Sequence, residues 1–262
     1  MRTNFDRVYV TAQEDVAVLT LNHPEVMNAA SLELVEGMGK ALSHIEENPG
    51  FRAIVITGEG RGFCSGANLS GPDLGSGLRD AGAVLESHFH PLLRRLRDLN
   101  IPLVTAVNGA AAGVGMSLAL MGDIVLAARS AYFLQAFARI GLVPDGGSTW
   151  LLPRLIGLAR ARELSMLAEK LPAEKALEWG LINRVCDDAS LMDDALAMAH
   201  RLAQGPASLA LIRRLYWQSP ENSYEAQINE ERQAQRRAGK TSDFGEGVAA
   251  FLQKRPAKFT GQ

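Results

Sequence analysis

The stretch AIVITGEGRGFCSGA, residues 53–67, decides the fold of this chain. It opens with a short apolar run typical of a buried strand and continues as a loop punctuated by glycine. The same order recurs downstream, where 102–107 is a second apolar strand, 108–115 a loop of small residues, 116–121 an apolar helix and 124–127 another strand. Strand, glycine-rich turn and helix repeated in this way predict an α/β fold with parallel pairing and crossover connections.

The segments on either side of this repeat predict a hairpin before it and helices after it. Two β-branched runs, 8–10 and 16–21, enclose a polar turn, and residues 31–45 have apolar positions at helical spacing with Ser31 as the N-cap. Because helical patterns dominate the C-terminal part, we expect a core at 1–195 and a helical region at 196–262. Further helices are expected at 83–99, 159–167, 173–179, 190–203, 207–217 and 221–238.

The overall composition is that of an ordinary globular protein. The 262 residues are 47% hydrophobic and 21% charged, and 27 Lys+Arg stand against 29 Asp+Glu for a net charge of -2. This balance argues against nucleic acid and anionic membrane surfaces as partners. No apolar stretch reaches the length of a membrane span, and the first residues lack the apolar centre of a signal peptide. Two cysteines in apolar runs, Cys64 and Cys186, fit reduced thiols, so we expect a cytoplasmic location.

The two glycine-rich loops are candidates for an anion-stabilising site. Gly113, Val114 and Gly115 open an apolar helix, where unpaired N–H groups favour a developing negative charge, and a second loop exposing N–H groups would complete an oxyanion hole. A tight turn without function accounts for either loop equally well.

Other kinds of site find little support in the sequence. There is no Walker A motif, and the glycines at 113 and 115 lack the last glycine of a dinucleotide fingerprint, which argues against ATP and NAD. The histidines do not combine with the cysteines at zinc spacing, and His88 and His90 fit surface positions, so no metal is expected. Ser65 does not lie in a nucleophile elbow.

Asp145 is an acid in an apolar and glycine-rich setting, within IGLVPDGGSTW at 140–150. It fits an N-cap for the helix that follows, and it fits equally a general base whose pKa burial has raised. The residues alone leave both interpretations open.

Four motifs together resemble those of the enoyl-CoA hydratase/isomerase (crotonase) superfamily: NHPEVMNA at 22–29, GFCSGANL at 62–69, NGAAAGVG at 108–115 and GDI at 122–124. The resemblance covers nearly the whole chain. It implies a crotonase-like spiral of strand-strand-helix units with a helical C-terminal trimerisation region, and a homotrimer or a dimer of trimers. It also implies an acyl-CoA thioester substrate, with coenzyme A as part of the substrate and no separate cofactor.

Site residues follow from the same resemblance. The oxyanion-hole amides are expected at Ala67 and Val114, and the C-terminal Phe251 and Lys254 are expected against the coenzyme A of a neighbouring subunit. The remaining residues expected to line the substrate path are Met27, Ala29, Ser65, Asn68, Leu69, Gly113, Ser117, Phe137 and Leu142.

Two positions depart from the pattern of the hydratases in this family. Where hydratases carry two water-positioning glutamates, this chain has Ser117 and Phe137, neither of which can act as a general base. VPD at 143–145 and TWLLPR at 149–154 instead resemble the isomerase subgroup, including the ring-epoxide isomerases of bacterial phenylacetate breakdown. We therefore expect Asp145 to move a proton during double-bond or ring-epoxide isomerisation.

Two alternatives stay open beside isomerisation. One is a hydratase with non-standard catalytic groups, and the other is a non-catalytic acyl-CoA binder or RNA-binding relative on the same fold. The acyl group itself also stays open.

Overall fold

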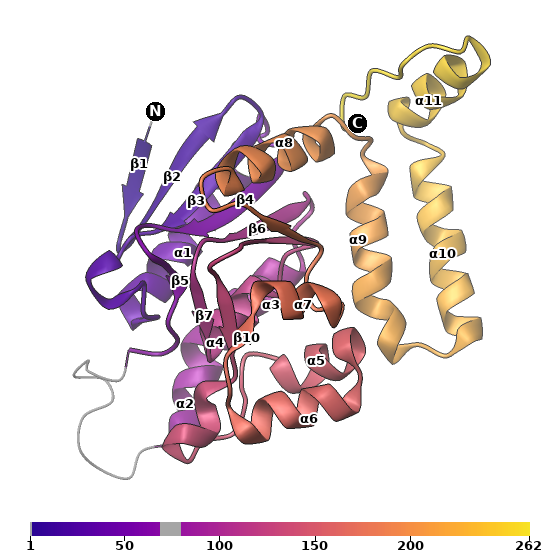
Figure 1. Ribbon diagram of the computed structural model, residues 1–262. Coiled ribbons are helices and arrows are strands. Elements are labelled where there is room, and N and C mark those ends of the chain that lie inside the picture. Colours follow the sequence, from indigo (N-terminus) through magenta and orange to yellow (C-terminus); the bar gives the residue numbers. More distant parts are fainter. Residues whose placement is uncertain (1, 69–79) are drawn as a thin grey trace.

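The computed structural model describes residues 2–68 and 80–262 and has an α/β architecture (Figure 1). Within that part, the larger sheet runs in the order β1-β2-β3-β4-β6-β8-β11. Its first three strands pair antiparallel, and from β3 onward every pairing is parallel, which confirms the predicted α/β class. Its strands are β1 (Arg2–Phe5), β2 (Val8–Gln13), β3 (Val16–Leu21), β4 (Ala53–Gly58), β6 (Leu103–Val107), β8 (Ile124–Ala128) and β11 (Arg184–Cys186).

Strands of a second, smaller sheet alternate along the chain with strands of the larger one. Strands β4, β6 and β8 are each followed directly along the chain by a short strand of the second sheet, whose order is β10-β9-β7-β5. This alternation between two sheets is the strand-strand-helix spiral that the resemblance implies. The sequence analysis assigned 108–115 to a loop, but its three alanines form β7, because residues this small can be wholly buried beside both neighbouring strands. The strands are β5 (Gly62–Cys64), β7 (Ala110–Ala112), β9 (Tyr132–Leu134) and β10 (Leu171–Pro172).

Helices cover the sheets and present apolar stripes to them. In α1 (Leu32–Glu46) the Ser31 side chain accepts a hydrogen bond from the N–H of Leu34, as predicted for an N-cap. The helix predicted at 83–99 is continuous but contains a π-helical turn, η3 (Leu85–Phe89), between α2 and α3. The other helices of the core are η1 (Pro24–Val26), α2 (Ala81–Val84), α3 (His90–Arg97), α4 (Val114–Ala119), η4 (Ala136–Ile140), α5 (Ser148–Ile156), α6 (Leu158–Leu167), α7 (Ala173–Glu178) and α8 (Leu191–Ala203).

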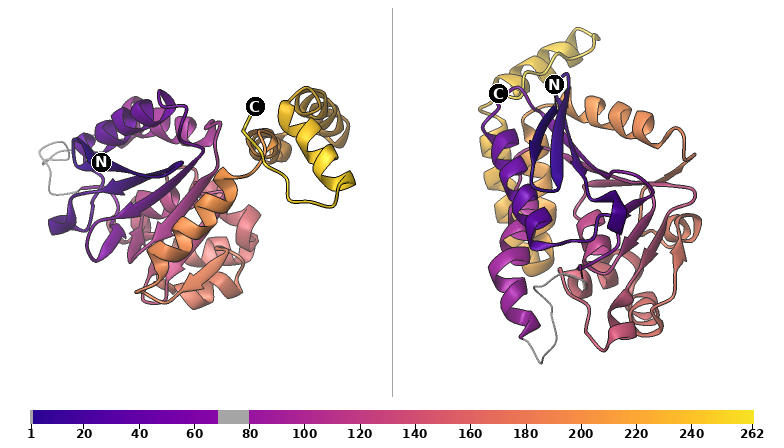
Figure 2. Two further views of the ribbon diagram at one scale, coloured as in Figure 1. Left: turned by 90° about the horizontal axis from the view of Figure 1, so that it is seen from above. Right: turned by 90° about the vertical axis from the view of Figure 1, so that its left-hand side faces the viewer.

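The C-terminal helices stand to one side of the sheets (Figure 2). They are α9 (Ser208–Gln218), η5 (Ser219–Glu221), α10 (Tyr224–Ala238) and α11 (Ser242–Leu252). The boundary expected after residue 195 falls inside α8, whose buried residues continue to Ala203 and which packs on β3, β4, β6 and β8. The helical region therefore begins after α8. No helix in the described residues is long and apolar enough to cross a membrane.

Arg213 ties the C-terminal region to the core. This buried side chain on α9 forms an ion pair of 2.8 Å with Asp123, just before β8. It also donates to the carbonyl oxygens of Leu96 at 2.6 Å and Leu99 at 3.3 Å, at the end of α3. A buried guanidinium needs such partners to offset its desolvation, so α9 has one well-defined position against α3.

Candidate active site

The two glycine-rich loops of the sequence meet in space, at the ends of β5 and β7. Gly66 has a φ of +101° and Gly113 a φ of +53°, both in the left-handed region that favours glycine. A Cβ added to Gly113 would lie 3.7 Å from the Cα of Gly66, and one added to Gly66 would lie 3.0 Å from the carbonyl oxygen of Ala112. The backbone angle therefore favours glycine at both positions, and at Gly66 the close approach of Ala112 favours it as well.

Each loop presents a backbone N–H group. Beside Ala67, the N–H of Ala30 donates to Gly66 at 2.7 Å and the N–H of Asn68 donates to Ala30 at 3.3 Å, so this parallel bridge does not use the N–H of Ala67. Val114 is the first residue of α4, and the first N–H groups of a helix have no partner inside it. Two N–H donors on adjoining loops are the elements of an oxyanion hole.

Asp145 is a partly buried acid in the loop between η4 and α5. Its side chain does not cap α5: the N-cap is Gly147, and it is the main-chain carbonyl oxygen of Asp145 that accepts from Ser148, from N–H at 3.1 Å and from Oγ at 2.6 Å. The capping interpretation is therefore wrong. Its Oδ1 is buried with no hydrogen-bond partner among the described residues. Burial raises the pKa of Asp145 to about 6, against a smaller lowering by the charge of His90.

Ser117 joins the Asp145 loop to the helix that begins at Val114. Its side chain is fully buried, and its Oγ donates to the carbonyl oxygen of Asp145 at 3.1 Å. Gly146, the residue after Asp145, has a φ of +60°, and a Cβ added there would lie 2.7 Å from the Cβ of Ser117. This contact holds the acid at a constant place relative to the loop of Val114.

Phe137 closes the site from the side of η4. It is buried, and its ring lies 3.7 Å from the position of a Cβ added at Gly113. An apolar ring over this loop helps to exclude water from the N–H groups, which strengthens their interaction with a negative oxygen.

A cavity of about 690 Å³ opens beside Asp145 and is bounded by α3, α5 and α9. Gly146 and Gly147, the two residues after the acid, form part of its wall. Across it the rings of Trp150 and Trp217 stack at 5.7 Å, so α9 covers the cavity from the C-terminal side. The other lining residues are His90, Leu93, Arg94, Arg97, Asp98, Leu99, Asn100, Met121, Leu151, Ala210, Arg214, Gln218 and Glu221.

The chain was compared with known protein families, relatives and solved structures. The profile described as Enoyl-CoA hydratase/isomerase covers residues 11–262. The chain belongs to this family. It is 45% identical over 253 residues to the 1,2-epoxyphenylacetyl-CoA isomerase of Escherichia coli, covering 95% of this chain and 97% of that protein. It is 44% identical over 250 residues to a probable enoyl-CoA hydratase of Rhodobacter capsulatus, covering 95% and 96%. A crystal structure of an enoyl-CoA hydratase from a Polaromonas species superposes with a TM-score of 0.90 at 37% identity, covering 97% and 99%.

The residues expected along the coenzyme A path of an enoyl-CoA hydratase/isomerase lie beside the first loop. Ser65 connects to the segment before α1: its N–H donates to Met27 at 3.0 Å and its Oγ donates to Val26 at 3.0 Å. Ala29 lies buried in the same segment, and Asn68 follows the loop half-buried. Leu69 lies outside the described residues. The structure brings the described members of this set together.

The other predicted site residues lie farther apart. Leu142 is 45% exposed, and its N–H donates to the carbonyl oxygen of Phe137 at 3.0 Å. Phe251, on α11, is 82% exposed and Lys254 follows that helix, at the end of the C-terminal region remote from α4 and α5 (Figure 1). Within one subunit these two side chains do not meet the site, so their contact with a neighbour's coenzyme A stays a prediction.

The sequence analysis missed polar neighbours of Asp145. His90 was assigned to the surface, yet it is half-buried and lines the cavity beside the acid. Its i,i+4 spacing from Glu86 was a usable signal for an ion pair. The sequence could not reveal that this side of the helix faces a loop more than fifty residues later in the chain.

One group of potential metal ligands occurs in the described residues, at Glu14, Asp15 and His200. His200 Nδ1 lies 3.2 Å from Asp15 Oδ1. It is a contact between α8 and the β2–β3 turn, and the absence of a metal stays a prediction.

Proposed function

We propose that this acyl-CoA enzyme is an isomerase in which Asp145 alone moves a proton along an enoyl-CoA. The carboxylate takes a proton from C2 of a 3-enoyl-CoA, and the electron pair passes into the thioester to form an enolate. The N–H groups of Ala67 and Val114 bind the enolate oxygen. Asp145 then returns the proton to C4, and the double bond moves to C2, in conjugation with the thioester carbonyl.

One observation carries this proposal: a buried carboxylate oxygen of Asp145 has no hydrogen-bond partner among the described residues, beside two loops with N–H donors. Leaving a buried acceptor unpaired costs about 1–3 kcal/mol, and such costs are tolerated mainly where the group has a task. A pKa of about 6 suits both steps, since at neutral pH the group is a base and, once protonated, an acid strong enough to return its proton.

The residues at positions 117 and 137 favour isomerisation over hydration. Ser117 uses its hydroxyl on the main chain of Asp145, and Phe137 offers only an apolar ring. Adding water needs groups that activate water and protonate the α-carbon, and neither residue supplies them. The likeness to an isomerase at 45% identity supports the same direction, while the nearly equal likeness to a probable hydratase keeps hydration as the rival.

The test compares Asp145→Asn with the unchanged protein on 3-enoyl-CoA thioesters, on ring-epoxyphenylacetyl-CoA and, for water addition, on crotonyl-CoA. We expect isomerisation to fall by a factor of about a hundred or more in the variant, and crotonyl-CoA hydration to be minor in both proteins. Undiminished isomerisation in Asp145→Asn would refute the role of the acid. Efficient hydration of crotonyl-CoA would favour the hydratase alternative, and coenzyme A binding without turnover would favour a non-catalytic binder.

We also propose assembly as a homotrimer or a dimer of trimers. Apolar side chains are exposed on the C-terminal helices, among them Phe244 at 56% and Phe251 at 82%. In such an assembly Phe251 and Lys254 would reach a neighbour's coenzyme A. Sedimentation equilibrium checks the mass, and Phe251→Ala is expected to raise KM for acyl-CoA. A cytoplasmic location and a role in phenylacetate or fatty acid breakdown stay predictions.

A further inference from the structure

Lys254 has a well-defined backbone position just after α11. Gln253 is the C-cap of that helix, and Lys254 follows it with a φ of +53°, at a place where glycine is the usual residue. The N–H of Lys254 donates to the carbonyl oxygen of Phe251 at 3.2 Å, and the N–H of Arg255 donates to that of Ala250 at 3.1 Å. These two bonds end the helix and turn the chain back at the lysine.

Glu246, on α11, binds the chain directly after Lys254. Its Oε1 accepts from Nη1 of Arg255 at 2.6 Å, and its Oε2 accepts from Nη2 of the same side chain at 2.8 Å. Oε1 also accepts from the main-chain N–H of Lys258 at 2.7 Å. A carboxylate that binds both prongs of a guanidinium fixes orientation as well as distance. The turn that carries Lys254 is therefore held to α11 both before and after the lysine.

Asp243, at the start of α11, holds the chain farther on. This buried carboxylate accepts from the N–H groups of Thr260 at 2.7 Å and Gly261 at 2.9 Å. It also accepts from the N–H of Ala207 at 2.8 Å, at the N-cap of α9. The segment after Lys254 is thus anchored to both α11 and α9.

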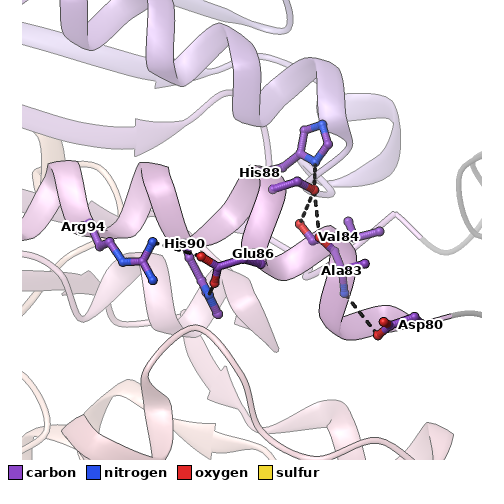
Figure 3. A network of polar contacts seen from close by, with 8 residues as sticks. Asp80, Ala83, Val84, Glu86, His88, His90 and Arg94 are labelled. Carbon is purple, nitrogen blue, oxygen red and sulfur yellow. Dashed lines mark hydrogen bonds and ion pairs between the residues drawn. The ribbon is translucent and has the colours of Figure 1, made fainter.

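The ion pairs of Glu86 are of a different kind. Figure 3 shows this acid beside His90, at 2.8 Å from Nδ1, and Arg94, at 3.4 Å from Nη1. All three side chains lie on the helical segment 81–97, so these contacts join successive turns of one helix. Exposed pairs of that kind contribute little to stability. The partners of Glu246 lie beyond the end of its helix, so its contacts determine where the chain goes next.

Lys254 is the basic side chain of this turn that is left for a partner. Arg255 is bound to Glu246, whereas the exposed ammonium group of Lys254 has no hydrogen bond or ion pair among the described residues. A long side chain loses less freedom on binding when the main chain that carries it is already fixed. The phosphate groups of coenzyme A are anions that such an ammonium group binds as a point charge.

We propose that Glu246, supported by Asp243, is a positioning residue that holds Lys254 where its ammonium group meets a phosphate of coenzyme A bound to a neighbouring subunit. This inference rests on the proposed contact between Lys254 and coenzyme A. Glu246 itself does not touch the substrate. It keeps the turn closed, so that Lys254 loses less freedom when the phosphate binds.

The experiment measures the binding of hexanoyl-CoA, a saturated thioester that has no double bond to move. Isothermal titration gives its Kd for the unchanged protein, for Glu246→Ala, for Lys254→Ala and for the double variant. KM and kcat on a 3-enoyl-CoA are measured on the same proteins, and sedimentation equilibrium reports their assembly. Glu46→Ala is the matched control, because Glu46 also binds both prongs of an arginine, Arg95, at 3.2 and 2.7 Å, but on α1.

We expect Lys254→Ala to raise the Kd about tenfold, because it removes a charged contact with a phosphate. Glu246→Ala should raise it about three- to fivefold, because the lysine remains but its turn is released. The double variant should match Lys254→Ala alone, since Glu246 acts only through the lysine. KM should follow the Kd with less change in kcat, and Glu46→Ala should leave Kd and KM in place.

An unchanged Kd in Glu246→Ala, an equal rise in Glu46→Ala, or a further rise in the double variant over Lys254→Ala overturns the inference. Loss of assembly in Glu246→Ala also overturns it, because Glu246 would then hold subunits together rather than position Lys254. An unchanged Kd in Lys254→Ala refutes the contact with coenzyme A, and the inference falls with it. If the unchanged protein binds hexanoyl-CoA but isomerises no 3-enoyl-CoA, the isomerase proposal fails by itself, and the titrations still decide the role of Glu246.

Discussion

Replacing Asp145 by asparagine is expected to stabilise the protein while it removes the base. The carboxyl group has a pKa of 3.8 as a free side chain and about 6 in the folded protein, because it is partly buried. The folded state thus prefers the protonated form. The stabilisation that goes with this is present below about pH 3.8 and is lost as the pH rises through about 6, so at neutral pH the ionised carboxylate destabilises the fold.

The size of the effect follows from the difference between the two pKa values. About two units at about 1.4 kcal/mol each set an upper bound of about 3 kcal/mol. Because the side chain is only partly buried, solvent screening reduces this, and we expect Asp145→Asn to gain about 1–2 kcal/mol at pH of about 8. For a chain of this length that corresponds to a rise in Tm of about 2–8 °C.

Thermal unfolding of both proteins across the pH range measures this gain. It should be full above about pH 6 and shrink toward zero as the pH approaches about 4. Asp193→Asn, the same change at an exposed position of α8, serves as the control for the substitution itself. A gain that does not vary with pH, or a loss of stability at alkaline pH, would mean that Asp145 is not a desolvated carboxylate.

Three other perturbations test the site and its support. The pH profile of activity on 3-enoyl-CoA should have an acid limb with a midpoint near pH 6, below which activity falls about tenfold per pH unit, whereas a midpoint near 4 would contradict burial of Asp145. Gly66→Ala places a Cβ 3.0 Å from the carbonyl oxygen of Ala112 at a φ of +101°. We expect kcat of this variant to fall about a hundredfold with less change in KM. A retained kcat would exclude this loop from the oxyanion hole. Arg213→Met removes the ion pair with Asp123, whose side chain is 25% exposed, and should cost about 1–3 kcal/mol in urea unfolding, an expectation that an unchanged midpoint would contradict.

Local patterns were sufficient to predict the elements of the core. Apolar runs at 53–57 and 102–107 became β4 and β6, and Ser31 caps α1 as expected, because strand burial and capping depend on a few adjacent residues. The glycines at 66 and 113 marked the two loops for the same reason, since a positive φ is a local requirement. The two loops therefore could be located from the sequence, although the chemistry proposed for them came from resemblance to a family.

The tertiary structure decided what the local patterns could not. The sequence by itself determined that residue 145 is an acid beside two glycines, and it left an N-cap and a base equally open. Only the packed fold shows that its side chain caps no helix, that Ser117 holds its main chain and that His90 lines the same cavity as the two glycines after the acid. The physical reason is that a pKa depends on desolvation and on nearby charges, and those come from α3 and α4, which lie tens of residues away in the chain and reach Asp145 only through packing.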